Sequence, residues 1–198
     1  MLKKVLTLFI CTFSLFTFSQ PKFELGLTTH GSWFSVNELT NVSMKNGFAA
    51  GAGICVSKSL IYRFSVRSGL EYQYREMQQY KQTGISSIDG SWEKFPQHYF
   101  VVPLLLLYNM NENFIVFGGV ENAWLTNYEN VYQKPEQNWE VGFGCSKHKL
   151  QWSLSYVWSP ENQDFAKKSA DGFNGYTYVA YDYSMLRLNL SYPFWQKK

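Results

Sequence analysis

Beyond its first twenty residues, the sequence lacks the long apolar runs that build helical membrane proteins. No later segment approaches 18 uninterrupted apolar residues, so no transmembrane helix is expected there. A convincing helical period is also missing, because apolar residues do not recur at three- and four-residue steps. These absences leave a protein that is built from strands.

Cysteine and metal-binding patterns are scarce as well. The chain has three cysteines, and only Cys55 and Cys145 lie beyond residue 20. An even number permits a disulfide outside the cytoplasm, but we expect two separate thiols that are buried or face lipid. No HExxH, HxxxH or CxxC spacing occurs, so we expect no metal and no cofactor. The three histidines are His30, His98 and His148.

An excess of charge of one sign is missing too. The 18 basic residues face 15 acidic ones, and without Lys3 and Lys4 the basic count falls to 16. A chain this close to neutral gives no reason to expect a nucleic-acid partner.

The N-terminus has the pattern of a secretory signal peptide. Lys3 and Lys4 precede the apolar segment 5–18, and Thr17 and Ser19 are small residues before a cleavage site. We therefore predict a signal peptide over 1–19 and one domain over 20–198. The alternative is an uncleaved anchor, for which the apolar run is shorter than the ~20 residues that a spanning helix needs. Lipidation of Cys11 is not expected, because Ile10 stands where that signal needs a small residue.

The remaining chain alternates with a period of two. In segment 63–75, Arg63, Arg67, Glu71 and Arg75 lie on one face, while the other face is apolar and aromatic. Eight such segments are expected as strands: 22–34, 47–57, 61–75, 97–108, 114–126, 138–146, 150–158 and 179–194.

The expected connections alternate in length without exception. Long connections span 35–46, 76–96, 127–137 and 159–178, and short ones span 58–60, 109–113 and 147–149. An outer-membrane barrel has long extracellular loops and short periplasmic turns. The pattern predicts an all-β fold, an eight-stranded antiparallel up-and-down transmembrane β-barrel in the outer membrane. The chain is expected to be a monomer.

Aromatic residues make up 19% of the chain, and their spacing fits such a barrel. Tyr62 and Tyr72 are ten residues apart, as are Phe114 and Trp124. Ten residues at ~3.3 Å each, tilted by ~40°, rise ~25 Å, the height of the apolar band of these barrels. The predicted aromatic girdle comprises Tyr62, Tyr72, Tyr74, Tyr108, Phe114, Trp124, Trp139, Trp158 and Tyr192.

The charged face is expected to line the interior of the barrel. Its predicted polar cluster comprises Arg63, Arg67, Glu71, Arg75, Glu140 and Arg187, with Glu24 and Glu121 as further candidates. An eight-stranded barrel is just wide enough for side chains to fill it. The cluster is therefore interpreted as a rigid polar core, with a selectivity ring in a narrow pore as the alternative. Pro103 within a strand predicts a bulge or a missing ladder bond.

The chain resembles the PorT-like outer-membrane β-barrel family, small eight-stranded barrels of Gram-negative bacteria. The resemblance covers nearly all of the chain after the signal peptide, and the matching segments are 67–72, 99–108, 117–119 before Trp124, and 187–192. The chain departs from the pattern at Val120 and Glu121, where relatives often carry Pro-Tyr. The resemblance implies no active site, and some relatives are linked to protein secretion.

We therefore expect a non-enzymatic outer-membrane barrel with a structural or interaction role through its extracellular loops. The expected partners are outer-membrane lipid, lipopolysaccharide and an envelope or secretion-complex protein. One alternative is a lipid-modifying enzyme, because a His base near a Ser hydroxyl can activate it, and His30 and Ser32 share a face. The other is a soluble periplasmic lipocalin-like barrel, which requires the apolar face to point inward.

Overall fold

The computed structural model describes residues 23–38, 44–61, 63–82, 90–126, 135–147, 150–160, 163–168 and 176–197. Its strands are β1 (Phe23–Glu38), β2 (Met44–Ser59), β3 (Phe64–Gln82), β4 (Gly90–Asn109), β5 (Phe114–Leu125), β6 (Glu136–Lys147), β7 (Leu150–Trp158), β8 (Gln163–Lys168) and β9 (Tyr176–Lys197). This part of the chain contains no helix long and apolar enough to cross a membrane.

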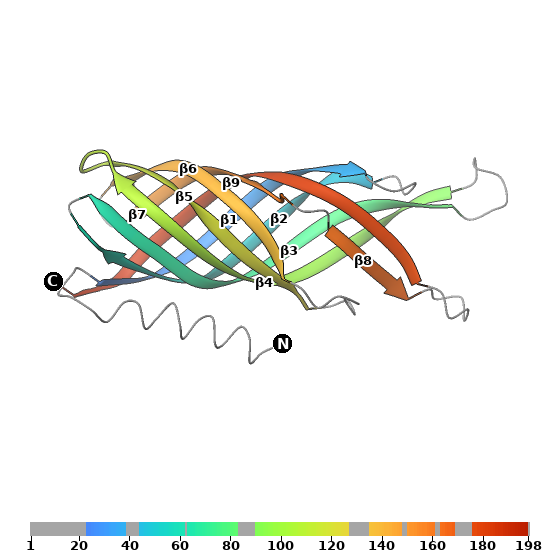
Figure 1. The fold of residues 1–198 in the computed structure, drawn as a ribbon, viewed down its shortest axis with the longest axis horizontal. Helices are drawn as coiled ribbons and strands as arrows, with labels where there is room; N and C mark the ends of the chain where they lie inside the picture. Colours follow the sequence, from blue (N-terminus) through green and yellow to red (C-terminus); the bar gives the residue numbers. More distant parts are fainter. Residues whose placement is uncertain are drawn as a thin grey trace.

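Eight of the strands close into a barrel (Figure 1). Each strand from β1 to β7 pairs antiparallel with the next, β7 pairs with β9, and β9 pairs with β1. Strand β8 pairs only with the first part of β9, between Lys168↔Tyr176 and Gln163↔Tyr181, and is not part of the closed wall. The predicted eight-stranded antiparallel barrel is confirmed.

The two ends of the barrel differ. Phe23 lies opposite both Lys58 and Lys197. The start of β1, the end of β9 and the β2–β3 turn therefore lie at the same end of the barrel. The short β4–β5 and β6–β7 connections lie at this end too, and we call it the short-turn end. In the β4–β5 turn the Asn111 side chain accepts hydrogen bonds from the backbone N–H groups of Asn113 and Phe114, a local pattern that favours tight turns. The opposite end is the long-loop end.

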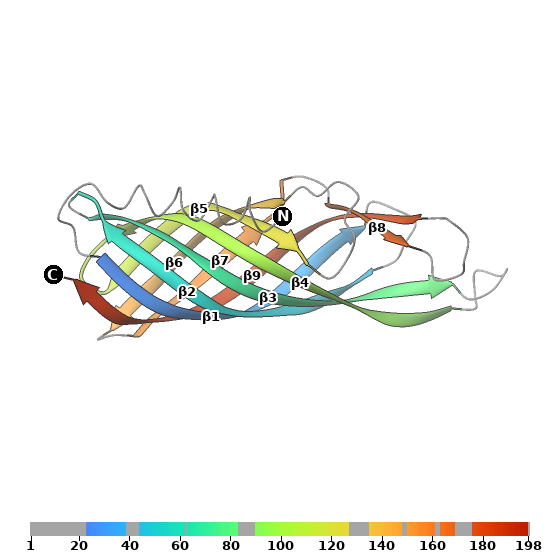
Figure 2. The ribbon, with the colours of Figure 1, turned by 90° about the horizontal axis from the view of Figure 1, so that it is seen from below.

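Strands β3 and β4 are longer than the sequence predicts. Segment 76–96 was expected as a loop, but the β3–β4 ladder continues through it to the pair Gln82↔Gly90. Strand β5 pairs with β4 only from Tyr99 onward, whereas β2 stays paired with β3 as far as Met44↔Gln79. The β3–β4 hairpin therefore projects beyond β5, and it is two-stranded only beyond Gln79 (Figure 2). The strict alternation of apolar and polar residues that marks the wall strands is absent from segment 76–96, so the period of two did not indicate the extension. The expected loop 159–178 likewise contains β8.

Alternate side chains point to opposite faces of the wall, and the outer face is the apolar one. On β3, the exposed fraction is 45% for Tyr72 and 0% for its neighbour Gln73. Exposed apolar residues occur on every strand of the wall, among them Leu27, Ile54, Phe64, Leu106, Phe114, Val141, Trp152 and Leu188. The interior therefore receives the polar side chains.

The interior has apolar clusters on both sides of its polar residues. Toward the long-loop end, Phe34, Met77, Tyr99 and Met185 belong to one buried apolar cluster. Toward the short-turn end, a second cluster comprises Leu105, Leu107, Ile115 and Phe117. The two clusters contain the inward residues Val101 and Leu105 of β4, which lie on either side of Pro103.

Pro103 interrupts the β3–β4 ladder as predicted. The pairing stops after Ser68↔Leu104 and resumes at Glu71↔Val101, and Pro103 lies in the gap. Proline has no N–H to donate to the ladder. The Pro103 carbonyl still has a partner on β3, because the Ser68 hydroxyl donates to it at 2.9 Å. The proline is thereby accommodated in a wall that has no edge.

We predict that Gly119→Ala destabilises the barrel by about 1–3 kcal/mol, the usual range for overpacking. A Cβ at Gly119 would lie 2.1 Å from the Leu104 carbonyl oxygen and 2.9 Å from Leu105 Cα, so backbone would have to move. Urea unfolding of the barrel in detergent micelles measures the change.

Gly31→Ala is the matched control, because a Cβ at Gly31 meets no atom within 4 Å. It should leave the unfolding midpoint near that of the unsubstituted protein. Equal midpoints for the two variants would show that the wall does not pack closely at Gly119.

Candidate functional site

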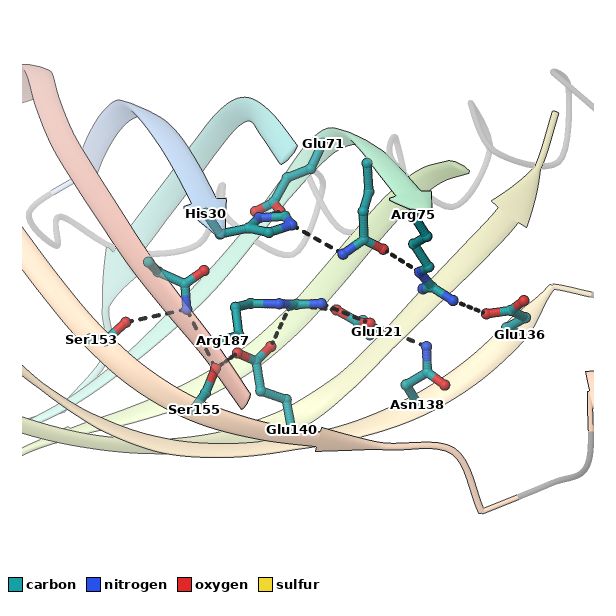
Figure 3. Close-up of polar contacts among 12 residues, drawn as sticks. His30, Glu71, Arg75, Glu121, Glu136, Asn138, Glu140, Ser153, Ser155 and Arg187 are labelled. Carbon is teal, nitrogen blue, oxygen red and sulfur yellow. Dashed lines mark hydrogen bonds and ion pairs between the residues drawn. The ribbon is translucent and has the colours of Figure 1, made fainter. Parts of the chain in front are cut away.

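A buried ionic cluster fills the middle of the barrel (Figure 3). Arg187 on β9 is its first centre, and its guanidinium donates to both carboxylate oxygens of Glu121, at 2.8 and 3.2 Å. The same guanidinium lies 3.5 Å from Glu140, which also accepts a 2.6 Å bond from the Ser155 hydroxyl. Bidentate pairing of this kind fixes geometry as well as charge. Strands β5, β6, β7 and β9 are thus joined across the interior.

Arg75 on β3 is the second centre. It donates to Glu136 at 2.8 Å, and Glu136 also accepts hydrogen bonds from the hydroxyls of Tyr99 (2.5 Å) and Tyr183 (2.9 Å). The Arg75 guanidinium lies 4.0 Å from the ring centroid of Tyr99 and 4.7 Å from that of Tyr183. Cation–π contact and ion pairing therefore hold the same buried charge.

Gln73 connects Arg75 to a third centre at His30. Its side-chain oxygen accepts from Arg75 at 2.8 Å, and its amide nitrogen lies 3.0 Å from Nε2 of His30. The other ring nitrogen, Nδ1, is 3.2 Å from a Glu71 carboxylate oxygen. Because the Gln73 amide can only donate, Nε2 accepts and the ring proton is assigned to Nδ1, facing Glu71.

Acidic groups outnumber guanidinium groups in this cluster. Arg75 and Arg187 face four buried carboxyl groups, and amide and hydroxyl donors add further hydrogen bonds. Arg75 Nη2 and Arg187 Nε are buried without a hydrogen-bond partner. The carboxyl groups are those of Glu71, Glu121, Glu136 and Glu140. Because buried charges need partners of opposite charge, the ion pairs of the interior constrain many side chains at once. Among the described residues, no group of His, Cys, Asp and Glu could hold a metal ion.

The structure brings together most of the residues predicted for the interior. Glu71, Arg75, Glu140 and Arg187 lie within the cluster. Arg67 lies nearer the short-turn end, where it is half-buried and hydrogen-bonded to Ser57 and Gln151. Of the further candidates, Glu121 lies at the centre of the cluster and Glu24 accepts a bond from Gln196 near the strand ends.

Arg63 does not line the interior. It lies in the β2–β3 turn, is exposed, and donates to the Met110 carbonyl at 2.7 Å. Strand β3 begins only at Phe64, so the alternation that placed Arg63 inside does not extend to it. Conversely, Glu136 was missed because it lay in the expected loop 127–137, whereas β6 begins at this residue.

The predicted aromatic girdle is spread over both ends of the wall. Four of its members are exposed on the outer face, namely Tyr72, Phe114, Trp139 and Tyr192, and Trp158 is half-buried. Tyr74 and Tyr108 are half-buried, and the Tyr72 hydroxyl hydrogen-bonds to the His98 ring. Trp124 is buried and packs in a cluster with Val102. Tyr62 lies outside the described residues.

Two small cavities lie in the described part of the interior. One cavity of about 30 Å³ lies between the ionic cluster and the short-turn end, and Cys55, Arg67 and Glu71 are among its lining residues. A second cavity holds about 10 Å³. Since a single water needs roughly 10–15 Å³, these cavities fit one or two water molecules.

His30 and Ser32 are both buried inside the barrel. Nε2 of His30 faces Gln73, and no hydrogen bond joins the His30 ring to the Ser32 hydroxyl. The arrangement therefore does not place an activated serine against lipid. Cys55 is buried, Cys145 is half-buried, and both are free thiols.

Comparisons with known proteins show the fold. No protein-family model matches the chain, and no curated protein matches it either. Among solved structures, the outer membrane protein AlkL in lipid bilayers is similar, with a TM-score of 0.51, 14% identity, and coverage of 86% of this chain and 90% of AlkL. OprG from Pseudomonas aeruginosa has a TM-score of 0.50 and 8% identity, with 87% and 96% covered. The chain shares the architecture of small outer-membrane barrels, and the PorT-like resemblance stays a prediction.

We predict that Arg187→Met destabilises the barrel by roughly 3–5 kcal/mol, because Glu121 and Glu140 would lose their partner while staying buried. The midpoint of urea unfolding in micelles measures the loss. Arg63→Met removes an exposed arginine of the same chain and should change the midpoint little. If the two variants unfold at the same urea concentration, the ionic cluster does not hold the barrel together.

Proposed function

We propose that this chain is an integral outer-membrane β-barrel that anchors the β3–β4 hairpin outside the cell for contact with a partner molecule. The supporting observation is the orientation of the wall. Leu106, Val141 and Leu188 are each about half exposed, while Glu121, Glu140 and Arg187 are almost completely buried. An outer face of this kind is stable in hydrocarbon and unfavourable in water.

The ends of the barrel suggest its direction in the membrane. Outer-membrane barrels keep short turns in the periplasm and long connections outside. The short-turn end is then periplasmic, which agrees with export through the predicted signal peptide 1–19. The β3–β4 hairpin is then extracellular.

The hairpin is the part of this end best suited to contact a partner. From Tyr99 to Gly90, β4 continues for nine residues, or about 30 Å of extended chain. On its outward face the Tyr80 and Trp92 rings meet at 5.4 Å, and Lys94 forms a 2.9 Å ion pair with Glu76. A rigid projection that displays aromatic and charged side chains is typical of an interaction element.

The two other functions inferred from the sequence receive less support. A lipocalin-like carrier needs an apolar cavity, whereas the middle of this interior is ionic and the cavity beside it, lined in part by Arg67, Glu71 and Arg187, holds only about 30 Å³. A lipid-modifying enzyme needs a serine that reaches lipid, whereas Ser32 is buried among inward residues. We propose that the barrel is a non-enzymatic monomer in contact with outer-membrane lipid and lipopolysaccharide. The PorT-like resemblance adds an envelope or secretion-complex protein as the candidate partner.

Labelling on intact cells tests the proposed direction. A Lys94→Cys variant carries its thiol on the hairpin, where the native side chain is 70% exposed. A membrane-impermeant maleimide should therefore label this variant on whole cells. The unsubstituted protein should stay unlabelled, because Cys55 is buried and Cys145 is partly covered within the wall.

Asn113→Cys is the matched control at the other end. Asn113 is exposed in the β4–β5 turn and contributes only its backbone N–H to the turn. This variant should react only after the outer membrane is permeabilised. Labelling of Asn113→Cys, and not of Lys94→Cys, on intact cells would reverse the proposed direction and refute the function.

A further inference from the structure

Two lysines lie in one cross-strand row at the base of the hairpin. Lys45 on β2 is opposite Gln78 on β3, and Gln78 is opposite Lys94 on β4. Strands lie about 4.8 Å apart, so the two lysine backbones are separated by roughly 10 Å. We call Lys45, Gln78 and Lys94 the lysine row.

A bulge in β2 brings Lys45 to the outer face. The β2–β3 register shifts between Lys45 and Phe48. Without the shift, Lys45 would share the inward face of Ala49, which is 1% exposed. Instead its ammonium lies 4.1 Å from the ring centroid of Trp92. Bulges often redirect a side chain in this way, and here the result is a second cation on the outward surface.

The surroundings of the row combine positive charge with aromatic faces. Trp92 packs edge-on against Tyr80, at an interplanar angle of 63°. Glu76 pairs with Lys94 and accepts a 2.8 Å bond from the Tyr74 hydroxyl. Two ammonium groups thus face one carboxylate among the described side chains of this patch. The net charge favours an anionic ligand.

The height of the row matches the membrane surface. Phe64 and Tyr74 are ten residues apart on β3, a rise of about 25 Å that spans the apolar band. Gln78 is four residues further on, or about 10 Å above the band. Lysine side chains are long and flexible enough to reach back toward the headgroups.

We propose that the lysine row binds the phosphorylated sugar headgroup of lipid A in the outer leaflet. Lys45 and Lys94 donate to its phosphate oxygens, and Trp92 offers an apolar ring face to the sugar. Basic residues beside an anionic leaflet strengthen binding in just this way. The inference rests on the proposed outer-membrane function, because it requires the hairpin to emerge from the outer leaflet.

Titration of the purified barrel in neutral detergent tests the site, with native mass spectrometry as the readout. The probes are lipid A that carries both phosphates and the same lipid after dephosphorylation. The double variant Lys45→Gln/Lys94→Gln should bind phosphorylated lipid A about 25-fold more weakly, from about fivefold for each lysine. The unsubstituted barrel should bind dephosphorylated lipid A with similarly low affinity.

Arg63→Gln is the matched control, because it removes one exposed cation from the opposite end of the barrel. It should bind lipid A as the unsubstituted protein does. A heat-dependent mobility shift on a denaturing gel confirms that each variant is folded before titration.

Three outcomes would overturn the assignment: unchanged binding by the double variant, an equal loss in Arg63→Gln, or equal affinity of the unsubstituted barrel for phosphatidylglycerol. The labelling experiment distinguishes failure of this site from failure of the function. If the hairpin is labelled on intact cells but the barrel does not bind lipid A, the proposed function stands and only the headgroup site is refuted.

Discussion

The fold depends on one constraint: in a closed wall, alternate side chains of each strand face either the outside of the barrel or its enclosed interior. Apolar residues cover the outside, so Arg75 and Arg187 enter an interior from which most water is excluded. Buried charges of this kind persist only when they find partners. Glu136 and Glu121 supply them, and the interior becomes a set of ion pairs between strands far apart in sequence.

Much of this arrangement can be predicted from the sequence because the period of two is a local signal. The eight wall strands, their alternating connections, the inward side of Glu71 and the ladder gap at Pro103 all follow from neighbouring residues. The pairing partners do not. Nothing local indicates that Arg187 binds Glu121, which is 66 residues away, because that contact depends on barrel closure and on the tilt of the strands.

The differences between expectation and structure occur where the chain leaves the wall. Glu136 begins β6 at a position expected in a loop, and the β3–β4 hairpin continues where the apolar alternation ends. Arg63 is misplaced for the converse reason, because its strand starts one residue later. The bulge beside Lys45 is also invisible to a strict period of two, and it determines which side of the sheet that lysine occupies. The candidate headgroup site therefore emerges only from the strand register.

Fluorescence quenching by lipids brominated on their acyl chains tests the orientation of the wall most directly. Trp139 and Trp152 are 47% and 41% exposed on the outer face. In vesicles the brominated lipid should strongly quench tryptophan emission, and Phe at both positions should remove much of this quenching. The proposed orientation would be contradicted if brominated lipid left the tryptophan emission unchanged while acrylamide in the aqueous phase quenched it.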